Sequence, residues 1–197
     1  MPTIPSTKAT VFQVLADEVD HLVKAGRLSR ADLERKLEPE DLRYLGKQLA
    51  PSSWVPISTS TRVFQLLFEL DGRGDIRDFM RERGRLNADR LKQAGIYRQF
   101  ESSVGRHSIE KIGRAGITIA SVMLNFTRWQ FESCEGEEPL LFRIIVEDAA
   151  DYPDVNRFAA EAFIERFVSG VPGAMKVRVS SARVASDRIV FTGEREC

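Results

Sequence analysis

Four short segments in the C-terminal half alternate between apolar and polar residues, and this period of two constrains the fold more than any other feature. They span residues 118–131, 140–147, 175–179 and 188–192. In the second of them, Phe142, Ile144 and Val146 lie on one face. Alternation with one polar face is typical of an antiparallel sheet that is covered on one side. Polar turn residues at 133–139 and 185–187 predict that the strands pair as two hairpins.

The segment between the two hairpins, residues 154–169, has the periodicity of an amphipathic helix. Its apolar residues recur every three or four positions and include Val155, Phe158, Ala159, Ala162, Phe163 and Phe167. Asp151 or Asp154 is expected to cap its start, and Gly170 to end it. The predicted order of this half is therefore ββαββ, with the helix covering the apolar face of the sheet.

The N-terminal half shows helical rather than strand periodicity. Helices are expected over residues 8–25 and 30–37, from Pro39 onward, over 61–70 with Thr59 or Ser60 as cap, and over 75–94, with further helical turns before 115. Residues 1–7 are expected to form a loose tail and residues 50–60 an irregular segment, while Gly84 is expected to allow close packing or a kink. The chain is thus predicted to be α+β, with a helical N-terminal half packed on an antiparallel four-stranded sheet.

Charge and cysteine content exclude several classes of protein. Lysine plus arginine and aspartate plus glutamate both number 29, so no net charge directs the molecule to nucleic acid or to an anionic membrane. Two cysteines, Cys134 and Cys197, do not make a disulfide framework. The first ten residues lack the apolar run of a signal peptide, and no stretch has the length of a membrane span. A cytoplasmic protein is therefore expected.

No residue pattern indicates catalysis. Glu147, Asp148 and Asp151 cluster after a predicted strand, but acidic residues are also typical of solvated loops and helix N-termini. Cys134 has no basic neighbour in sequence that would lower its pKa. There is no CxxC pair and no pair of closely spaced histidines, so a zinc site is not expected. The chain is predicted to be no enzyme and to carry no cofactor.

Several soft motifs give a resemblance to known proteins. They are Trp54–Val55–Pro56 before the helix 62–70, Gly74–Asp75, Gly84–Arg85, Asn125–Phe126 with Trp129, FRIIVEDAADYPD at 142–154, Phe167–Gly170, and the pairing of 177–179 with 188–191. With these residues the chain resembles the superfamily of TRAPP-type trafficking subunits, 4-vinyl reductase ligand-binding domains and haem nitric-oxide-binding domains, nearest a bacterial paralogous family. The resemblance spans about residues 42–194. It implies an N-terminal helical extension over 1–40 and a TRAPP-like α+β domain over 41–197.

The resemblance implies little chemistry. A haem-binding member needs an axial histidine, and the sequence has only His21 and His107. A lone histidine is usually solvated or a neutral hydrogen-bonded group, so neither is predicted to bind haem. The cysteine cluster typical of the 4-vinyl reductase type is missing, so no metal is expected there.

Two functions of different classes remain. The first is a sensory or signalling module that binds a small hydrophobic molecule between helices and sheet. Its expected lining is Phe126, Trp129, Phe142, Phe158, Phe163 and Phe191. The alternative interpretation is that these aromatic residues simply fill a close-packed core.

The second is a protein-interaction or scaffold subunit that acts as a homodimer or as part of a complex. Its expected contact is the exposed face of the helix 62–70, with Leu66 or Phe68 outward. Nucleic-acid binding is not expected. Arginines at 77, 81, 83, 85 and 90 share a helix with acidic residues at 78, 82 and 89, and this mixture predicts a solvated face.

Overall fold

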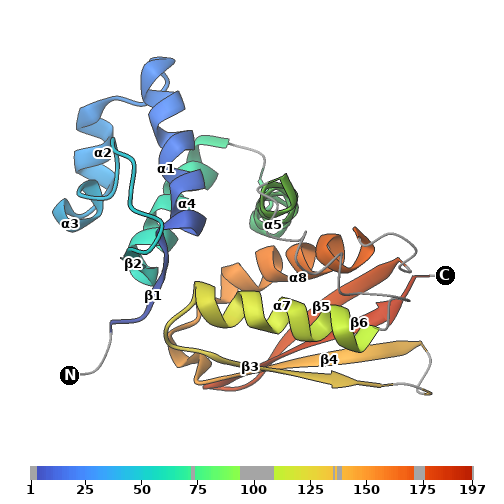
Figure 1. Cartoon of the computed structure of the whole chain (residues 1–197). Helices are drawn as coiled ribbons and strands as arrows, with labels where there is room; N and C mark the ends of the chain where they lie inside the picture. The colour runs from blue at the N-terminus through green and yellow to red at the C-terminus, as the bar shows by residue number, and fades with distance from the viewer. Residues whose placement is uncertain are drawn as a thin grey trace. The chain divides into compact units, whose positions relative to one another are not determined.

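The computed structural model describes residues 4–71, 74–93, 109–134, 136, 139–170 and 176–196. Contacts divide the chain into two compact units. The first unit comprises Met1–Gly74 together with Met123–Phe126, and the second comprises Asp75–Val122 and Thr127–Cys197. Figure 1 labels their helices and strands.

The first unit is mainly helical. Its elements are β1 (Ser6–Lys8), α1 (Ala9–Lys24), α2 (Arg30–Lys36), α3 (Pro39–Leu42), β2 (Trp54–Pro56) and α4 (Ile57–Asp71). The apolar stripe of α1 is buried through Phe12, Leu15 and Val19. Helix α2 begins with a capping box, in which the side chain of Ser29 accepts from the Asp32 backbone and the side chain of Asp32 accepts from the Ser29 backbone.

Two predictions for this unit are wrong. Ser6–Lys8, at the junction of the expected tail and the expected first helix, is a strand that pairs antiparallel with Trp54–Pro56 from the expected irregular segment. Strands of three residues are too short for a period of two to be recognised in the sequence. Because α4 already begins at Ile57, Thr59 lies inside the helix and caps nothing.

Asp41 is a buried charged residue of the first unit. Its side chain is fully inaccessible and accepts hydrogen bonds from Arg62 Nε at 2.6 Å and Nη2 at 2.7 Å, and from Thr59 Oγ1 at 2.6 Å. Burial by itself raises the pKa of the Asp41 carboxyl, but the hydrogen bonds from Arg62 and Thr59 outweigh it and leave the pKa lowered. The carboxylate thereby joins α3 to α4.

Asp41 is expected to make the protein sensitive to acid. Because its folded pKa lies below the ordinary value of 3.8, its stabilising effect is present at neutral pH and is lost as pH falls through the folded pKa. Asp41→Asn should therefore be less stable than the wild type at pH 7, by a margin that shrinks below about pH 4. Urea titrations of both proteins at several pH values measure this margin. A margin independent of pH would contradict the assignment.

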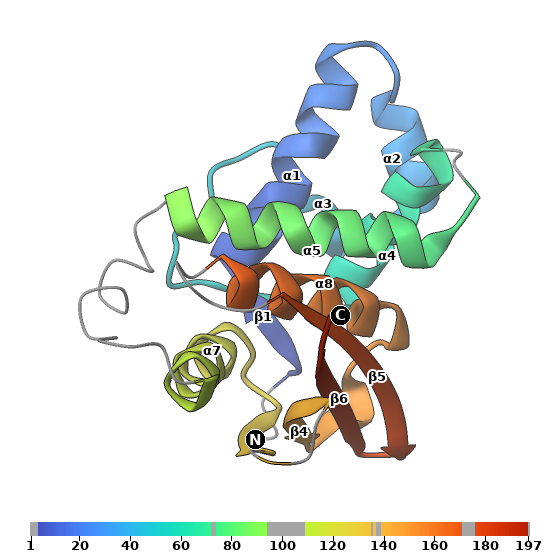
Figure 2. The ribbon, with the colours of Figure 1, turned by 90° about the vertical axis from the view of Figure 1, so that its right-hand side faces the viewer.

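The second unit contains the sheet. Its elements are α5 (Ile76–Gln93), α7 (Ile109–Met123, whose last residue groups with the first unit), β3 (Arg128–Ser133), β4 (Leu140–Glu147), the 3-10 turn η1 (Ala149–Asp151), α8 (Asp154–Ser169), β5 (Val177–Ala185) and β6 (Arg188–Arg195). The strand order is β3-β4-β6-β5, and every neighbouring pair is antiparallel. Helices α7 and α8 lie on the same face of the sheet, and α5 packs on α8 (Figures 1 and 2).

The α+β class predicted from the sequence is confirmed, with helices first and an antiparallel sheet after them. Two strands, α8 and two further strands follow one another along the chain, and α8 has the predicted limits. Its cap differs from the prediction. Pro153 occupies the cap position without a side-chain hydrogen bond, and Asp154 instead pairs with Arg157 and Arg183.

The predicted strand over residues 118–131 is wrong in its first half. Helix α7 continues to Met123, and β3 begins only at Arg128. Ile117, Thr118 and Ile119 are β-branched and favour strands locally. The apolar and small residues of this segment nevertheless also recur at helical spacing, and packing of that stripe on the sheet decides the outcome.

Glycine permits close contact at one helix crossing in this unit. A Cβ atom at Gly84 on α5 would lie 2.0 Å from the carbonyl oxygen of Ala159 on α8. The expected close packing at Gly84 is therefore confirmed. Among the described helices, none is both long and apolar enough to cross a membrane.

A candidate ligand cavity between two helices and the sheet

The second unit contains a cavity of about 70 Å³ between α7, α8, β3 and β4. Every lining residue that the structure describes is apolar. The lining consists of Ile109, Ile112, Gly113, Gly116, Ile117 and Ala120 from α7, Trp129 and Phe131 from β3, Phe142 and Ile144 from β4, and Ala160, Phe163, Ile164, Phe167 and Val168 from α8.

The spacing of these residues explains why they converge. On α7, Ile112, Gly116 and Ala120 recur every four residues and so share one face. On the strands, Trp129 and Phe131 are two residues apart and point to the same side of the sheet, as do Phe142 and Ile144. Phe131 lies directly opposite Ile144 in the register of β3 with β4.

Two glycines determine where the aromatic rings of the cavity lie. A Cβ atom at Gly113 would lie 2.1 Å from the ring of Phe131, and a Cβ atom at Gly193 would lie 2.1 Å from the ring of Phe142. The two rings stack on each other with centroids 5.6 Å apart. Gly193 lies inside β6, which extends three residues beyond the predicted limit at residue 192.

The structure brings three of the six predicted ligand-binding residues together. Trp129, Phe142 and Phe163 line the cavity, and their role in binding stays a prediction. The indole N–H of Trp129 donates to Thr127 Oγ1 at 2.9 Å, so its polar edge is already bonded.

The other three predicted residues lie elsewhere. Phe191 is fully buried and stacks on Trp129 with centroids 5.9 Å apart, outside the lining. Phe158 lies near the guanidinium groups of Arg77 and Arg157, at 5.3 Å and 5.7 Å. Phe126 belongs to the segment grouped with the first unit.

Phe131 and the whole α7 wall were not predicted. A strand was predicted to begin at residue 118, so the continuation of α7 to Met123 was not recognised. The helical spacing of Ile112, Gly116 and Ala120 is nevertheless visible in the sequence. Phe167 was expected in the stripe of α8 but not as part of a lining.

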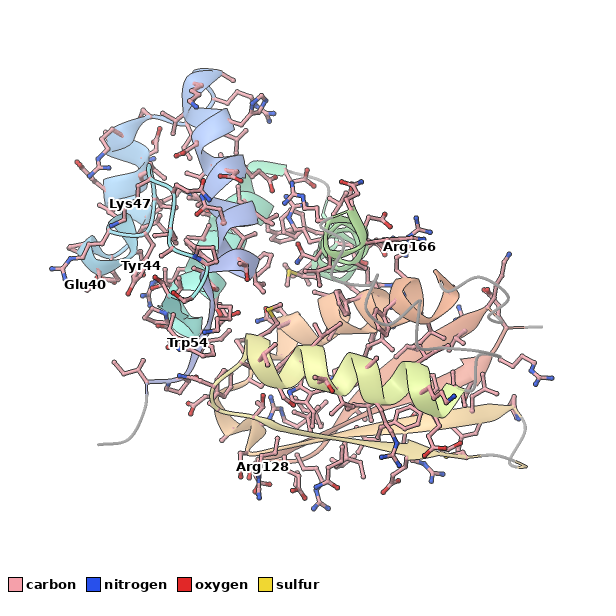
Figure 3. The ribbon with its side chains drawn as sticks, in the orientation of Figure 1. Glu40, Tyr44, Lys47, Trp54, Arg128 and Arg166 are labelled. Atoms are coloured by element: carbon pink, nitrogen blue, oxygen red, sulfur yellow. The ribbon has the colours of Figure 1, made fainter. Side chains whose placement is uncertain are left out.

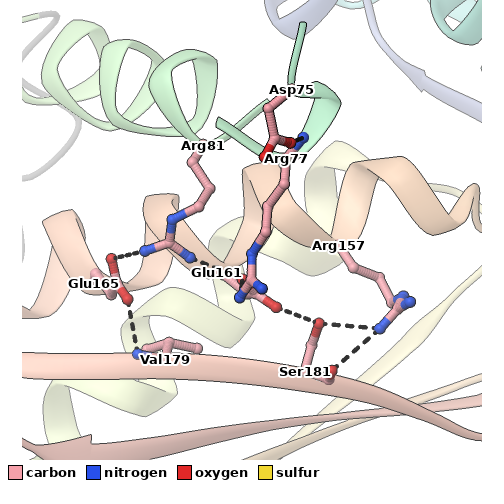
Figure 4. Close-up of polar contacts among 8 residues, drawn as sticks. All are labelled: Asp75, Arg77, Arg81, Arg157, Glu161, Glu165, Val179 and Ser181. Carbon is pink, nitrogen blue, oxygen red and sulfur yellow. Dashed lines mark hydrogen bonds and ion pairs between the residues drawn. The ribbon is translucent and has the colours of Figure 1, made fainter. Parts of the chain in front are cut away.

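A buried charge network lies on another face of α8 (Figure 4). Glu161 is 1% exposed and accepts hydrogen bonds from Arg81 of α5 at 2.8 Å and from the Ser181 hydroxyl of β5 at 2.6 Å. Glu165 accepts from the same guanidinium at 2.6 Å and from the backbone N–H of Val179 at 2.9 Å. The network joins α5, α8 and β5.

This network also corrects the expectation of a solvated arginine face on α5. Burial lowers the pKa of Arg81, but the carboxylates of Glu165 and Glu161 outweigh it and raise the pKa. Arg83 is buried over the ring of Phe79, at 3.8 Å from the ring centroid. Two of the five arginines therefore belong to the packed interior.

Two carboxylates at the C-terminal end of β4 pair with arginines. Asp148 binds Arg128 Nε at 2.7 Å, and Glu147 binds Arg188 Nη2 at 2.8 Å. Arg128 projects from the face of the sheet that α7 and α8 leave open (Figure 3). This arrangement agrees with the interpretation of these carboxylates as solvated charges, because exposed ion pairs of this kind are common on protein surfaces.

No protein-family model matches the sequence, and no curated protein matches it significantly. Solved structures do match. The Fe(II) unliganded H-NOX protein from K. algicida aligns with 96% of this chain and 97% of its own at 10% identity, with a TM-score of 0.61. The chain has the fold of the H-NOX proteins.

Two further H-NOX structures support the assignment of the fold. The H-NOX protein from S. oneidensis in the Fe(II)NO ligation state matches over 96% of this chain and 99% of its own, at 12% identity and a TM-score of 0.59. A point mutant of the T. tengcongensis H-NOX matches over 96% of this chain and 98% of its own, at 13% identity and a TM-score of 0.58. At these identities the likeness shows the fold alone. This fold is that of the haem nitric-oxide-binding proteins, one of the groups named in the sequence resemblance.

The H-NOX fold implies a haem, which needs a large pocket and an axial ligand. A porphyrin is far larger than a cavity of about 70 Å³, and the lining residues that the structure describes offer no axial ligand. The described residues contain no group of three histidine, cysteine or acidic residues able to hold a metal, and His21 is exposed on α1. His107 lies outside the described residues. The described part of the cavity lining therefore does not fit a haem.

Proposed function

We propose that this chain is a non-enzymatic sensory module that binds a small, uncharged, apolar molecule in the cavity of the second unit. The observation that carries the proposal is an all-apolar lining drawn from two helices and two strands. Cavities of about 150 Å³ bind benzene or xenon, so a cavity of about 70 Å³ suits a dissolved gas or a molecule of few heavy atoms. No cofactor takes part in the proposal.

The lining selects against polar ligands. A charged or hydrogen-bonding group in this cavity would lose its bonds to water and find no partner, which costs several kcal/mol. An apolar ligand gains dispersion contacts with the rings of Phe131, Phe142 and Phe163, and displaces no tightly bonded water. Binding should therefore depend on size and not on charge.

Xenon is a direct probe of this proposal. In a Trp54→Phe background Trp129 is the only tryptophan, and saturating xenon is expected to change its emission and to give a saturable xenon NMR shift. Ala160→Leu should fill the cavity and weaken binding at least tenfold, because it places a larger side chain in the lining. Ala182→Leu, on an exposed position of β5, should leave binding unchanged. A wild-type protein without saturable xenon binding would refute the proposal.

The alternative function is a protein-interaction subunit. The contact face expected on α4 is not available as predicted, because Leu66 is 2% exposed and Phe68 only half exposed. Membership of a TRAPP-like complex, a boundary near residue 40, a bacterial origin and a cytoplasmic location stay predictions. A different surface, the edge strand β3, favours self-association.

A further inference from the structure

The two edge strands of the four-stranded sheet differ in the hydrogen bonding of their outward backbone groups. Strands β3 and β5 are the edge strands, and each directs half of its backbone N–H and C=O groups away from its neighbour. The residues that point outward follow from the hydrogen-bond alternation. The N–H of Cys134 donates to the carbonyl of Leu141 at 2.9 Å, so the even-numbered residues of β3 bond to β4. Trp129, Phe131 and Ser133 therefore present their backbone groups outward.

Helix α8 covers the edge formed by β5. The outward N–H of Val179 donates to Glu165 at 2.9 Å, and the outward carbonyl of Ser181 accepts from Arg157 at 3.2 Å. For the outward backbone groups of Trp129, Phe131 and Ser133, the described residues supply no such partner. The outward backbone of β5 is thus bonded at two points to side chains of α8, whereas that of β3 offers, among the described residues, a row of donors and acceptors.

We propose that β3 pairs with β3 of a second copy of this chain, antiparallel, about a two-fold axis at Gln130. In this register Trp129 lies opposite the partner's Phe131, and the outward groups of these residues exchange backbone hydrogen bonds. Gln130 lies opposite the partner's Gln130 in a pair without backbone hydrogen bonds. The two four-stranded sheets then form one continuous sheet.

Charge selects this register among those that the alternation allows. Arg128 and Glu132 are exposed and lie on the same, open face of the sheet, two residues on either side of Gln130. A two-fold axis at Gln130 places Arg128 opposite the partner's Glu132, and the pair occurs twice. An axis at Trp129 or at Phe131 would place one of these charges opposite a glutamine instead. Opposite charges directly across strands favour pairing, and like charges oppose it.

The pairing strand is also a wall of the cavity. Trp129 and Phe131 point their side chains into the lining while their backbone groups form the edge. Pairing would hold this strand from both sides. The inference does not depend on the proposed ligand, because it rests on the backbone and on charge.

Disulfide trapping tests the register. Side chains in a directly opposite antiparallel pair have Cβ atoms about 4.5–5.5 Å apart, close to the range that a disulfide spans. In a Cys197→Ser background, Gln130→Cys is expected to give a covalent dimer under mild oxidation. Arg128→Cys and Glu132→Cys should each cross-link poorly, because four strand residues, about 13 Å, separate each from its own copy. A mixture of the Arg128→Cys and Glu132→Cys proteins should cross-link efficiently, because these two positions face each other in the proposed register.

Sedimentation equilibrium tests the charges without a new cysteine. Glu132→Lys places a lysine opposite the partner's Arg128 twice, and it should weaken dimerisation about tenfold. Ser180→Lys introduces the same side chain at an exposed position of the far edge strand and should leave dimerisation unchanged. A monomer at all concentrations would overturn the proposal. A dimer in which Gln130→Cys cross-links no faster than Arg128→Cys would overturn it as well, since another surface would then form the interface.

Discussion

Replacing Glu161 with alanine is expected to lower the free energy of unfolding by about 3–5 kcal/mol, the range seen when one partner of a buried ion pair is removed. The substitution leaves the guanidinium of Arg81, whose side chain is 15% exposed, with one carboxylate in place of two. It also removes the acceptor of the Ser181 hydroxyl, at 2.6 Å. Urea unfolding followed by circular dichroism measures the loss.

The matched control links the same two helices at the surface. Asp89 of α5 binds Arg166 of α8 at 2.7 Å, but the two side chains are 37% and 53% exposed (Figure 3). Asp89→Ala should therefore cost at most about 1 kcal/mol. Equal losses for Glu161→Ala and Asp89→Ala would show that burial of the network does not determine its contribution.

Gly84→Ala is the second substitution with a large expected effect. In an ordinary helix interior this change stabilises a protein by up to about 1 kcal/mol. Here the new Cβ would lie 2.0 Å from the backbone oxygen of Ala159, so α5 and α8 must move apart. Overpacking of this kind typically costs about 1–3 kcal/mol, and a contact with backbone should reach at least the upper end.

Gly116→Ala is the control for helix propensity. Gly116 also lies within a helix, α7, but a Cβ there would meet the ring of Phe167 at 3.4 Å, an ordinary contact. Its substitution should leave the melting temperature unchanged or slightly raised, whereas Gly84→Ala should lower it by several degrees. If both variants melt alike, the α5–α8 crossing is looser than the structure indicates.

Long periodic segments determined how much of the fold could be predicted. Helix α8 and strand β4 have strong patterns, of period 3.6 and period two, and the structure reproduces the predicted limits of both. Residues 117–122 carry both signals, because their β-branched residues favour a strand while their spacing fits a helix. Only packing against the sheet resolves that conflict, and packing is not visible in a local pattern.

The candidate site was predictable only in part for the same reason. Trp129, Phe142 and Phe163 lie on segments whose period was recognised, so their convergence followed from the layers. Phe131 was missed because its neighbours were assigned to the wrong element. Glu161 and Glu165 were missed because sequence does not show that Arg81 of α5 lies beside them.

The close approach of two rings to two glycines has a consequence for the evolution of related chains. Each ring occupies space that would otherwise belong to the partner residue's own side chain, so volume at position 113 trades against volume at 131, and volume at 193 trades against volume at 142. A relative that gains an alanine at 193 should carry a residue smaller than phenylalanine at 142. Such paired exchanges would reshape the cavity while leaving the sheet intact, and they offer a simple route by which one scaffold acquires different ligands.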